Sequence, residues 1–505
     1  VIPHSGGEAA PITEFPLFTF LYADLHAHML ALPITLLAIT WALSFVLRGR
    51  QSGGRLENIL LWGVGGLTIG ALSATNTWDF PTYMALGCVA VVWDRCRYSD
   101  SLDYKTMLSA SGRLVILVAL AIVCYLPYAK WFGSGYNAIE VWRGSTTPLY
   151  AFLKIHGLFL FIIMSFLIIE ARKWFRPEVA QNVWESGRLH TAMLLGALGL
   201  IAMALLVFLG GVQIAPLVLG MVSCGTLLLL QSSQTTSKRV VITMVILALF
   251  LTLVVEVLRL EGDISRMNTV FKFYFQAWTL FSITGGVAGV WVYQRVREWN
   301  RSSALLWLAG LGILVVTASS YTFLATAAKI ADRMAPEASH GLDGMAFMEK
   351  SQYRDKGQVV DLAPDYDAIR WLQENVRGSP VIVEAHAGEY KYGSRYTIYT
   401  GLPGVVGWNW HQRQQRAVTP ANLITERVED VNRFYRESDI AGALAFLRRY
   451  EVRYVVVGGY ERVYYPVTGL DKFEQMADAG MLEIAYDNGD VIVYEHNALG
   501  NESDY

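Results

Sequence analysis

A carboxylate and two imidazoles, Asp24, His26 and His28, alternate just before a long apolar run. In an extended chain all three share one face, whereas in a helix only Asp24 and His28 do. Together they are a plausible ligand set for a divalent metal, and Asp24 alone could act as a general base. The alternative is that they cap a helix end and contact lipid headgroups. The spacing predicts a catalytic or metal site with Asp24 as its best candidate.

Asp79 lies in a second polar cluster that begins at Asn76, between two apolar runs. Two carboxylates on the same side of a membrane, Asp24 and Asp79, could share a metal or hold an acceptor. The alternative is that Asp79 is the N-cap of a helix that has Pro81 in its first turn.

A third cluster enters an apolar run and contains Arg266, Asn268, Lys272 and Tyr274. A lysine within an apolar helix is costly unless it pairs or snorkels. Cations with hydrogen-bond donors at this depth suit a lipid phosphate or pyrophosphate, so we expect substrate binding here. The alternative is a salt bridge from Arg266 or Lys272 to one of three carboxylates, namely Asp263, Glu256 or Asp79.

A fourth cluster, in a loop-like run near the C-terminus, contains Trp410, His411, Arg413 and Arg416. Aromatic faces beside arginine donors suit a sugar or a phosphate. The same run could equally be a packing loop that seats its domain on a membrane part.

The composition indicates the kind of protein in which these residues lie. The chain has 505 residues, of which 53% are hydrophobic and 17% charged, and its mean hydropathy is +0.34. Soluble chains carry about 25% charged residues, so a soluble enzyme is disfavoured. A formal charge of −2 excludes a nucleic-acid partner, which requires a basic face.

Long apolar runs dominate the first two thirds of the chain, and about 20 apolar residues cross a bilayer. We expect a polytopic α-helical bundle of ten spans: Met29–Leu47, Ile59–Ala74, Phe80–Trp93, Leu114–Trp131, Leu149–Ile169, Thr191–Leu209, Val212–Leu230, Val240–Leu258, Thr269–Tyr293 and Ala304–Ala327.

Basic residues gather in alternate loops, which orients these spans. The arginine-rich loops, such as the one containing Arg48, Arg50 and Arg55, are expected to be cytoplasmic. Residues 1–28 and everything after 327 then lie outside. The prediction is a multi-pass plasma-membrane protein with an extracytoplasmic C-terminal domain.

Residues 328–505 alternate helical and strand patterns and predict an α/β domain in three layers. Strands are expected at 380–384, 453–458, 482–486 and 490–495. No Gly-x-Gly-x-x-Gly motif follows a strand, so nucleotide binding is not supported. The expected organisation is an external segment, 1–28, a bundle, 29–327, and this domain.

These motifs together resemble an uncharacterised multispanning membrane family, the "YYY" family, over nearly the whole chain. The resemblance rests on the runs 15–28, 76–81, 265–274, 400–416 and 457–462. That family is in turn distantly similar to the GT-C glycosyltransferases, such as oligosaccharyltransferases and protein mannosyltransferases.

The resemblance implies a GT-C-like fold and transfer of a sugar from a polyprenyl-phosphate-type lipid donor to an external acceptor. Asp24 would be the catalytic carboxylate of the first external loop, with Asp79, His26 or His28 as partners and a divalent metal (Mg or Mn) as cofactor. Arg266 and Lys272 would hold the donor phosphate. A GT-C core begins with a span before this loop, so upstream helices or an additional membrane chain are expected as partners.

Two other functions stay open. One is a non-catalytic structural or accessory subunit of a larger membrane complex that binds lipid or pigment, for which histidines near the membrane interface could ligate a tetrapyrrole metal. The other is a transporter, which ranks last because the ionisable residues gather at one outer mouth and not at mid-span.

Overall fold

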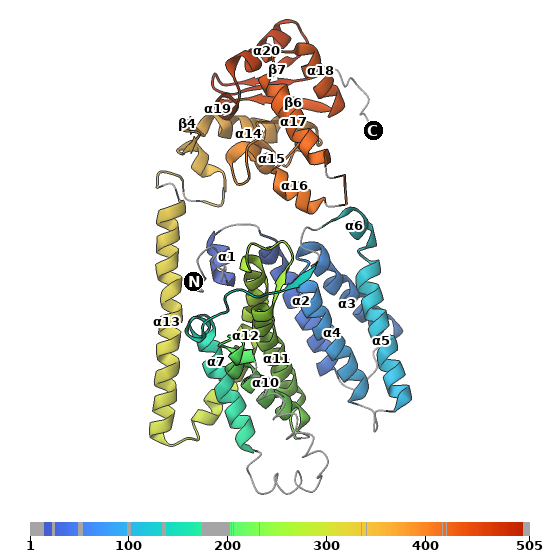
Figure 1. Ribbon diagram of the computed structural model, residues 1–505, viewed down its shortest axis with the longest axis vertical. Coiled ribbons are helices and arrows are strands. Elements are labelled where there is room, and N and C mark those ends of the chain that lie inside the picture. The colour runs from blue at the N-terminus through green and yellow to red at the C-terminus, as the bar shows by residue number, and fades with distance from the viewer. Residues whose placement is uncertain are drawn as a thin grey trace. The chain divides into compact units, whose positions relative to one another are not determined.

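The computed structural model describes residues 15–497, except 23–25, 49–53, 98–102, 134–137, 174–202, 204, 206, 232, 335, 340, 417 and 421. It divides into two compact units (Figure 1). The helical unit is Val1–Lys130 with Tyr136–Lys329, and the C-terminal unit is Trp131–Gly135 with Ile330–Tyr505. Each is described by itself.

Helices make up nearly all of the helical unit. They are α1 (Pro16–Tyr22), α2 (Ala27–Leu47), α3 (Arg55–Thr75), α4 (Asp79–Cys96), α5 (Tyr104–Val123), α6 (Leu126–Trp131), α7 (Leu149–Arg172), α10 (Ala215–Leu230), α11 (Thr236–Val257), α12 (Met267–Val296) and α13 (Arg301–Arg333). Two short strands, β1 (Ile139–Val141) and β2 (Leu258–Leu260), pair antiparallel. We call the end where α2, α4 and α12 begin the outer end, following the orientation expected from the basic loops, and the opposite end the inner end.

Six described helices are long and apolar enough to cross a membrane: α2, α3, α5, α7, α11 and α13. The expected ten spans are therefore not reached within the described residues. The helix α10 is shorter, and the predicted span Thr191–Leu209 lies largely outside the described residues. The predicted span Leu114–Trp131 differs most, because α5 already begins at Tyr104 and the chain turns at Cys124 before α6.

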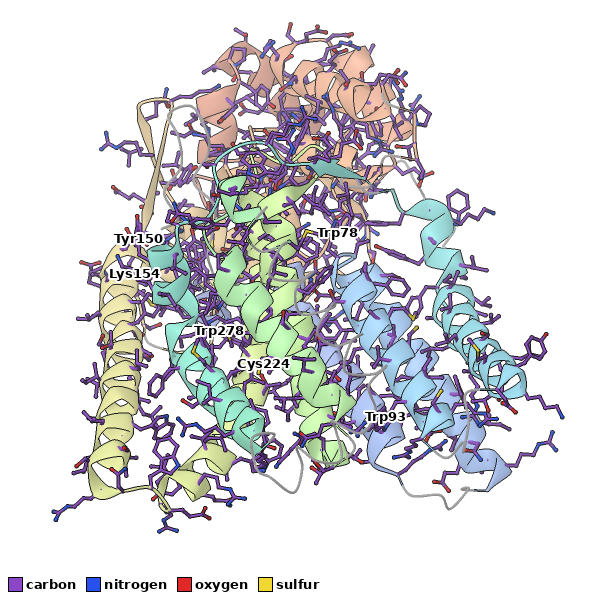
Figure 2. The ribbon with its side chains drawn as sticks, turned by 60° about the horizontal axis from the view of Figure 1, so that its bottom comes forward. Trp78, Trp93, Tyr150, Lys154, Cys224 and Trp278 are labelled. Atoms are coloured by element: carbon purple, nitrogen blue, oxygen red, sulfur yellow. The ribbon has the colours of Figure 1, made fainter. Side chains whose placement is uncertain are left out.

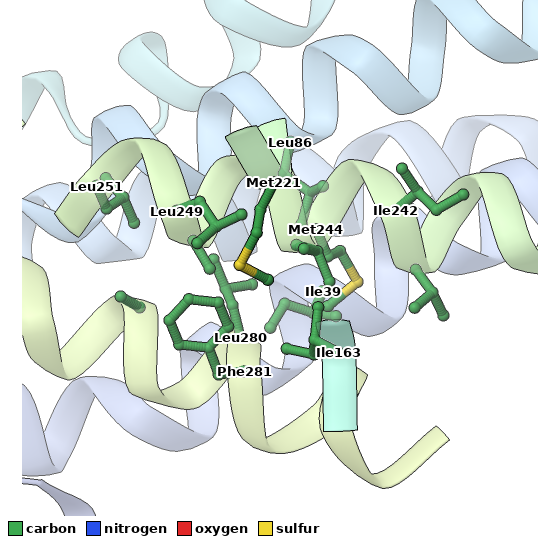
Figure 3. Packing of buried hydrophobic residues seen from close by; sticks show 14 of the residues in the cluster. Ile39, Leu86, Ile163, Met221, Ile242, Met244, Leu249, Leu251, Leu280 and Phe281 are labelled. Carbon is green, nitrogen blue, oxygen red and sulfur yellow. The ribbon is translucent and has the colours of Figure 1, made fainter. Parts of the chain in front are cut away.

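The core of the helical unit lies where α11 packs on α10 and α12, and where α2 packs on α3 and α4. Its side chains are mostly aliphatic, with Phe281 and Met244 among them (Figure 3). Small residues let α3 approach its neighbours. A Cβ on Gly66 would overlap Leu120, and one on Gly70 would overlap the backbone of Ala121. Two glycines four residues apart on one helix face are a common device for close packing in membranes.

The C-terminal unit contains a four-stranded sheet in the order β5-β6-β8-β7. The strands are β5 (Val381–Val383), β6 (Val452–Val457), β7 (Glu483–Asp487) and β8 (Ile492–Glu495), and a separate hairpin joins β3 (Gln352–Asp355) to β4 (Gln358–Asp361). β5 is parallel to β6, and the other pairs are antiparallel. The helices are α14 (Ala363–Asn375), α15 (Arg395–Thr400), α16 (Asn409–Gln415), α17 (Asn422–Arg436), α18 (Ile440–Arg449), α19 (Gly459–Tyr464) and α20 (Val467–Asp478), with 3-10 turns η2 (Ala346–Glu349) and η3 (Tyr392–Ser394).

Alternate residues of β6 belong to two different hydrophobic clusters. Val455 and Val457 pack with α17, α18 and α20, whereas Tyr454 and Val456 pack with α14 and α15. Because successive strand residues point to opposite faces, helices cover both faces of the sheet. The C-terminal unit is thus an α/β/α arrangement of three layers, and its strands lie within about two residues of those expected.

Candidate functional site

The histidine motif at the start of α2 packs against the start of α12. The ring centroids of His28 and Phe271 are 4.5 Å apart, and those of His28 and Phe275 are 4.9 Å apart. His28 is buried, and its Nε2 lies 3.0 Å from the hydroxyl of Thr19 on α1. The first and third sequence clusters, separated by more than 200 residues, therefore meet at the outer end of the helical unit.

Asp79 is the first residue of α4 and is only 5% exposed. Three side chains, those of Thr35, Asn76 and Gln276, face its carboxyl group. Its Oδ1 and the Nδ2 of Asn76 nevertheless have no hydrogen-bond partner among the described residues. A helix does start here with Pro81 in its first turn, but its N-cap is Trp78, so the N-cap alternative for Asp79 is wrong and Asp79 is the first helical residue. A buried carboxylate with an unused acceptor also remains suited to chemistry.

Gln276 of α12 joins the start of α4 to α12. Its Nε2 donates to the backbone oxygen of Trp78 at 3.0 Å, and its Oε1 accepts a hydrogen bond from Thr82 at 2.5 Å. Trp78 stands next to Asp79 at this end of α4, whereas Trp93 lies near the other end (Figure 2). Gln276, Thr35 and Thr82 were not among the expected site residues. The spacing of four between Lys272 and Gln276, which places both on one helix face, is the signal that could have found Gln276.

Lys272 of α12 is half-buried and lies within electrostatic reach of three groups. It interacts with the carboxyl groups of Asp79 and Asp263 and with the ring of His28. All three sequence clusters at the outer end thus contribute to one group of side chains. We call His28, Asp79, Lys272 and Gln276 the outer polar cluster.

Asn268 forms hydrogen bonds within the start of α12. Its backbone N and side-chain Nδ2 both donate to Asp263 Oδ1, at 3.0 and 3.1 Å. The backbone N and hydroxyl of Thr269 donate to the other oxygen of Asp263, at 2.8 and 2.7 Å. Asp263 thereby satisfies the first amides of the helix, where a negative charge is also favoured.

Arg266 does not join the outer polar cluster. Its guanidinium is 1% exposed and donates to Glu256 at 2.9 Å and to the hydroxyl of Thr147 at 3.2 Å. Thr147 in turn donates its backbone N to Glu256 at 2.7 Å. The salt-bridge alternative therefore holds for Arg266, which closes the turn between α11 and α12 and presents no guanidinium face to a ligand.

Tyr274 lies on the Arg266 side of α12. It is 1% exposed, and its ring centroid is 5.0 Å from that of the buried His156 on α7. Residues two apart on a helix point about 200° apart, so Lys272 and Tyr274 face different neighbours. The expected binding residues therefore lie on different faces of α12. Lys272 belongs to the outer polar cluster, whereas Tyr274 packs against α7.

The expected metal site is only partly within the described residues. The rings of His26 and His28 are 4.8 Å apart, but Asp24 lies outside the described residues. Among the residues that the structure describes, no group of three or more histidines, cysteines or carboxylates could hold a metal. The two imidazoles alone do not make a complete ligand set. The metal therefore stays a prediction that depends on Asp24.

The fourth cluster forms a short helix, α16, and not the expected loop. His411 Nε2 lies 3.0 Å from the hydroxyl of Tyr390, and Arg413 donates to the hydroxyl of Thr425 at 2.8 Å. Arg416 donates to Gln412 at 2.8 Å, while the indole of Trp410 is 53% exposed. An exposed indole beside cations remains compatible with either binding or packing.

A buried ionic cluster elsewhere in the C-terminal unit had no sequence prediction. Arg395 is fully enclosed and contacts Asp365 at 2.9 Å and Glu461 at 2.8 Å. Glu384, directly after β5, accepts backbone hydrogen bonds from Tyr396 and Thr397. Burial opposes charge on Glu384 and raises its pKa to about 7. This cluster fills the carboxyl end of the parallel strands, a common ligand position, with protein groups.

Comparisons with known proteins give a family match and matches to solved structures. The model of a family described as "Uncharacterized membrane protein (DUF2298)" matches residues 1–281, which include the whole outer polar cluster. No curated protein matches the sequence. Among solved structures, the archaeal oligosaccharyltransferase AglB from Archaeoglobus fulgidus, in complex with an inhibitory peptide and a dolichol-phosphate, is 11% identical with a TM-score of 0.29. The match covers 95% of this chain and 58% of that one, and so low a TM-score carries no conclusion about fold or function.

Proposed function

The chain belongs to the DUF2298 family of membrane proteins, and we propose that it is a membrane glycosyltransferase. This family membership confirms the resemblance to an uncharacterised multispanning family. The proposed reaction moves a sugar from a polyprenyl-phosphate-type lipid donor to an acceptor at the outer end. The observation that carries the proposal is the meeting of three helices at that end: Gln276 of α12 bonds to the start of α4 beside Asp79, and His28 of α2 packs on Phe271, the residue before Lys272.

In the proposed reaction, the acceptor hydroxyl attacks the anomeric carbon of the donor sugar. A new carbon–oxygen bond forms, the bond to the phosphate oxygen breaks, and the phosphate leaves with the bonding electron pair. A carboxylate takes the proton of the hydroxyl as general base. Asp79 has an unused oxygen for this step, and Asp24 stays the second candidate.

Lys272 supplies the positive charge that the leaving phosphate requires. An ammonium in a site with little water stabilises developing negative charge more than it would in bulk water. Gln276 holds α4 against α12 and so positions Asp79 relative to Lys272. Asn268 and Tyr274 act on this site only indirectly, through the start and the packing of α12. A divalent metal bound by Asp24, His26 and His28 would add a Lewis acid, and no step above depends on it.

The C-terminal unit, taken by itself, carries a second candidate surface for a sugar or a phosphate. The exposed indole of Trp410, with His411 and Arg413 on the same short helix and Arg416 directly after it, offers an aromatic face and cations. Such surfaces bind sugars and phosphates. We place this unit outside the plasma membrane because the expected cytoplasmic loops carry the basic residues.

Transfer of a labelled sugar in proteoliposomes tests the proposal. The purified protein is supplied with a polyprenyl-phosphate-linked sugar and with membrane acceptors, and the product is counted. Asp79→Asn should lower kcat at least about 100-fold, and Lys272→Gln should raise KM for the donor. Glu298→Gln, which removes an exposed carboxylate at the inner end of α12, is the matched control and should transfer normally.

Unchanged transfer by both outer variants would overturn this mechanism. A wild-type protein that transfers nothing but retains a visible absorption band through purification would instead favour the pigment-binding accessory subunit.

A further inference from the structure

An apolar groove lies in the inner half of the helical unit, between α2, α4, α10 and α11. Its volume is about 210 Å³, and its walls include Ile39, Leu43, Leu86, Val89 and Met244. Figure 3 labels three of these, Ile39, Leu86 and Met244, in the core around the groove. Val89 is 49% exposed, so the groove reaches the surface of the helical unit beside α4.

The groove is separate from the outer polar cluster. Trp93, which lines the groove, follows Asp79 by 14 residues on the same helix. At 1.5 Å per residue this places the two about 20 Å apart along α4. A donor phosphate held by Lys272 would therefore not lie in this groove.

The size and chemistry of the groove suit a hydrocarbon chain. A closed apolar cavity of about 150 Å³ is known to stay dry and to bind benzene. This groove is larger and almost wholly apolar. Its small volume does not suit a helix, which with its side chains is about 10 Å across.

Two polar groups stand at the inner mouth of the groove, and both have unused capacity. Arg239 donates to the backbone oxygens of Gln231 and Gln234 and lies over the Trp93 ring at 5.2 Å. Within the described part of the chain it pairs with no carboxylate. The indole Nε1 of Trp93 is buried and has no acceptor among the same residues.

Three neighbouring cations, Lys238, Arg97 and Arg113, differ in this respect. Lys238, the residue before Arg239, pairs with the buried Glu170 at 2.9 Å. Arg97 and Arg113 pair with the buried Asp94. The groove thus ends at Arg239, whose charge no described acidic side chain neutralises. The indole Nε1 of Trp93 beside it is a hydrogen-bond donor without a described acceptor.

We propose that this groove binds one acyl chain of an anionic glycerophospholipid from the inner leaflet. The acyl chain lies between the apolar walls, and the guanidinium of Arg239 donates hydrogen bonds to the phosphate. The Trp93 indole donates to a headgroup or ester oxygen. Arginine matches phosphate oxygens with paired donors, and tryptophan is favoured at the level of the headgroups. The inference does not depend on the transferase proposal.

Lipid binding to the purified full-length protein in neutral detergent tests this site. The thermal midpoint is followed during titration with phosphatidylglycerol or with phosphatidylcholine of identical acyl chains. The wild type should bind phosphatidylglycerol about tenfold more tightly, because only its headgroup has a net negative charge. Arg239→Gln should abolish this preference, and Arg239→Lys should retain part of it.

A variant that fills the groove tests the binding of the acyl chain independently of the headgroup. Val89→Trp should weaken binding of both lipids by about tenfold or more, because the new indole occupies the chain site. Val64→Trp places the same side chain on an exposed position of α3, and Arg55→Gln removes an exposed arginine of the same helix. Both controls should bind like the wild type.

Three results would overturn the proposal: equal affinity of the wild type for the two lipids, an unchanged preference in Arg239→Gln, or unchanged binding in Val89→Trp. A polyprenyl phosphate that displaces phosphatidylglycerol at equal concentration would also overturn it, by assigning the groove to the sugar donor. If Arg239→Gln fails to fold, the comparison of Val89→Trp with Val64→Trp still decides.

Discussion

Arg266 and Glu256 form an ion pair of 2.9 Å in which neither side chain is more than 1% exposed. The pair joins the end of α11 to the start of α12, and Thr147 completes it from the segment before α7. The alignment of α12, and with it the position of Lys272, depends on this closed group.

Removing one partner of this pair should destabilise the protein strongly. Arg266→Met leaves the Glu256 carboxylate buried without its partner, and we expect a loss of about 3–5 kcal/mol. Thermal unfolding of the purified variant measures the loss. The double variant Arg266→Met with Glu256→Met removes both charges and should recover most of it. Equal stability of the single and double variants would contradict a buried ion pair.

Gln276 should act as a positioning residue for the transfer reaction. Gln276→Met removes the hydrogen bond to the Trp78 carbonyl and frees the start of α4. We expect kcat to fall about tenfold or more with little change in KM for the donor, since Lys272 stays in place. Steady-state transfer assays measure both constants. Thr279→Val, which removes a hydroxyl bonded only within α12, serves as control.

Close packing of α3 on α5 should depend on Gly70. Gly70→Val drives two methyl groups into the Ala121 backbone and the Tyr125 ring, and we expect a loss of at least about 1–3 kcal/mol. Gly63→Val on the same helix meets nothing within 4 Å and should cost much less. Thermal unfolding compares the two. Similar losses would mean that glycine flexibility, and not contact, decides the effect.

Asp355 should make the C-terminal unit sensitive to acid. Burial alone would raise its pKa, but hydrogen bonds from Lys391, Tyr460 and Tyr464 outweigh this and hold the pKa at about 2. An aspartate has a pKa of about 3.9 when unfolded, so this stabilisation is present above pH 4 and is lost as the pH falls towards 2.

Asp355→Asn should therefore lower stability by about 1 kcal/mol at neutral pH, after allowance for solvent screening. The difference from wild type should disappear towards pH 2. Thermal midpoints of the full chain, recorded from pH 2 to pH 7, measure it. Asp471→Asn, an exposed carboxylate on α20, should show no such pH dependence.

The local elements were largely predictable, because apolar periodicity and strand patterns depend on neighbouring residues. β5, β6 and β7 begin within one residue of the expected positions. The run from Trp408 to Arg416 was expected as a loop, because its aromatic and charged residues carry no clear helical stripe. Its helix begins where Glu389 accepts a hydrogen bond from the backbone N of Trp410, a long-range contact.

The site was predictable only in part. The four-residue spacing of Lys272 and Gln276, and the opposite direction of Tyr274, follow from helix geometry. That Arg266 would choose Glu256 over Asp263 does not, since the choice depends on the turn through Gly262, whose φ is +78°. The meeting of His28 with Phe271 depends on how α2 packs on α12, which no local pattern encodes.

The two hydrogen bonds that Gln276 makes to the start of α4 have a mechanical consequence. Sliding α4 along α12 would break both at once, so the two bonds resist a shift of Asp79 past Lys272. Selection among ligands at the outer end would then depend on the shape of the ligand and not on a movement of α4 relative to α12.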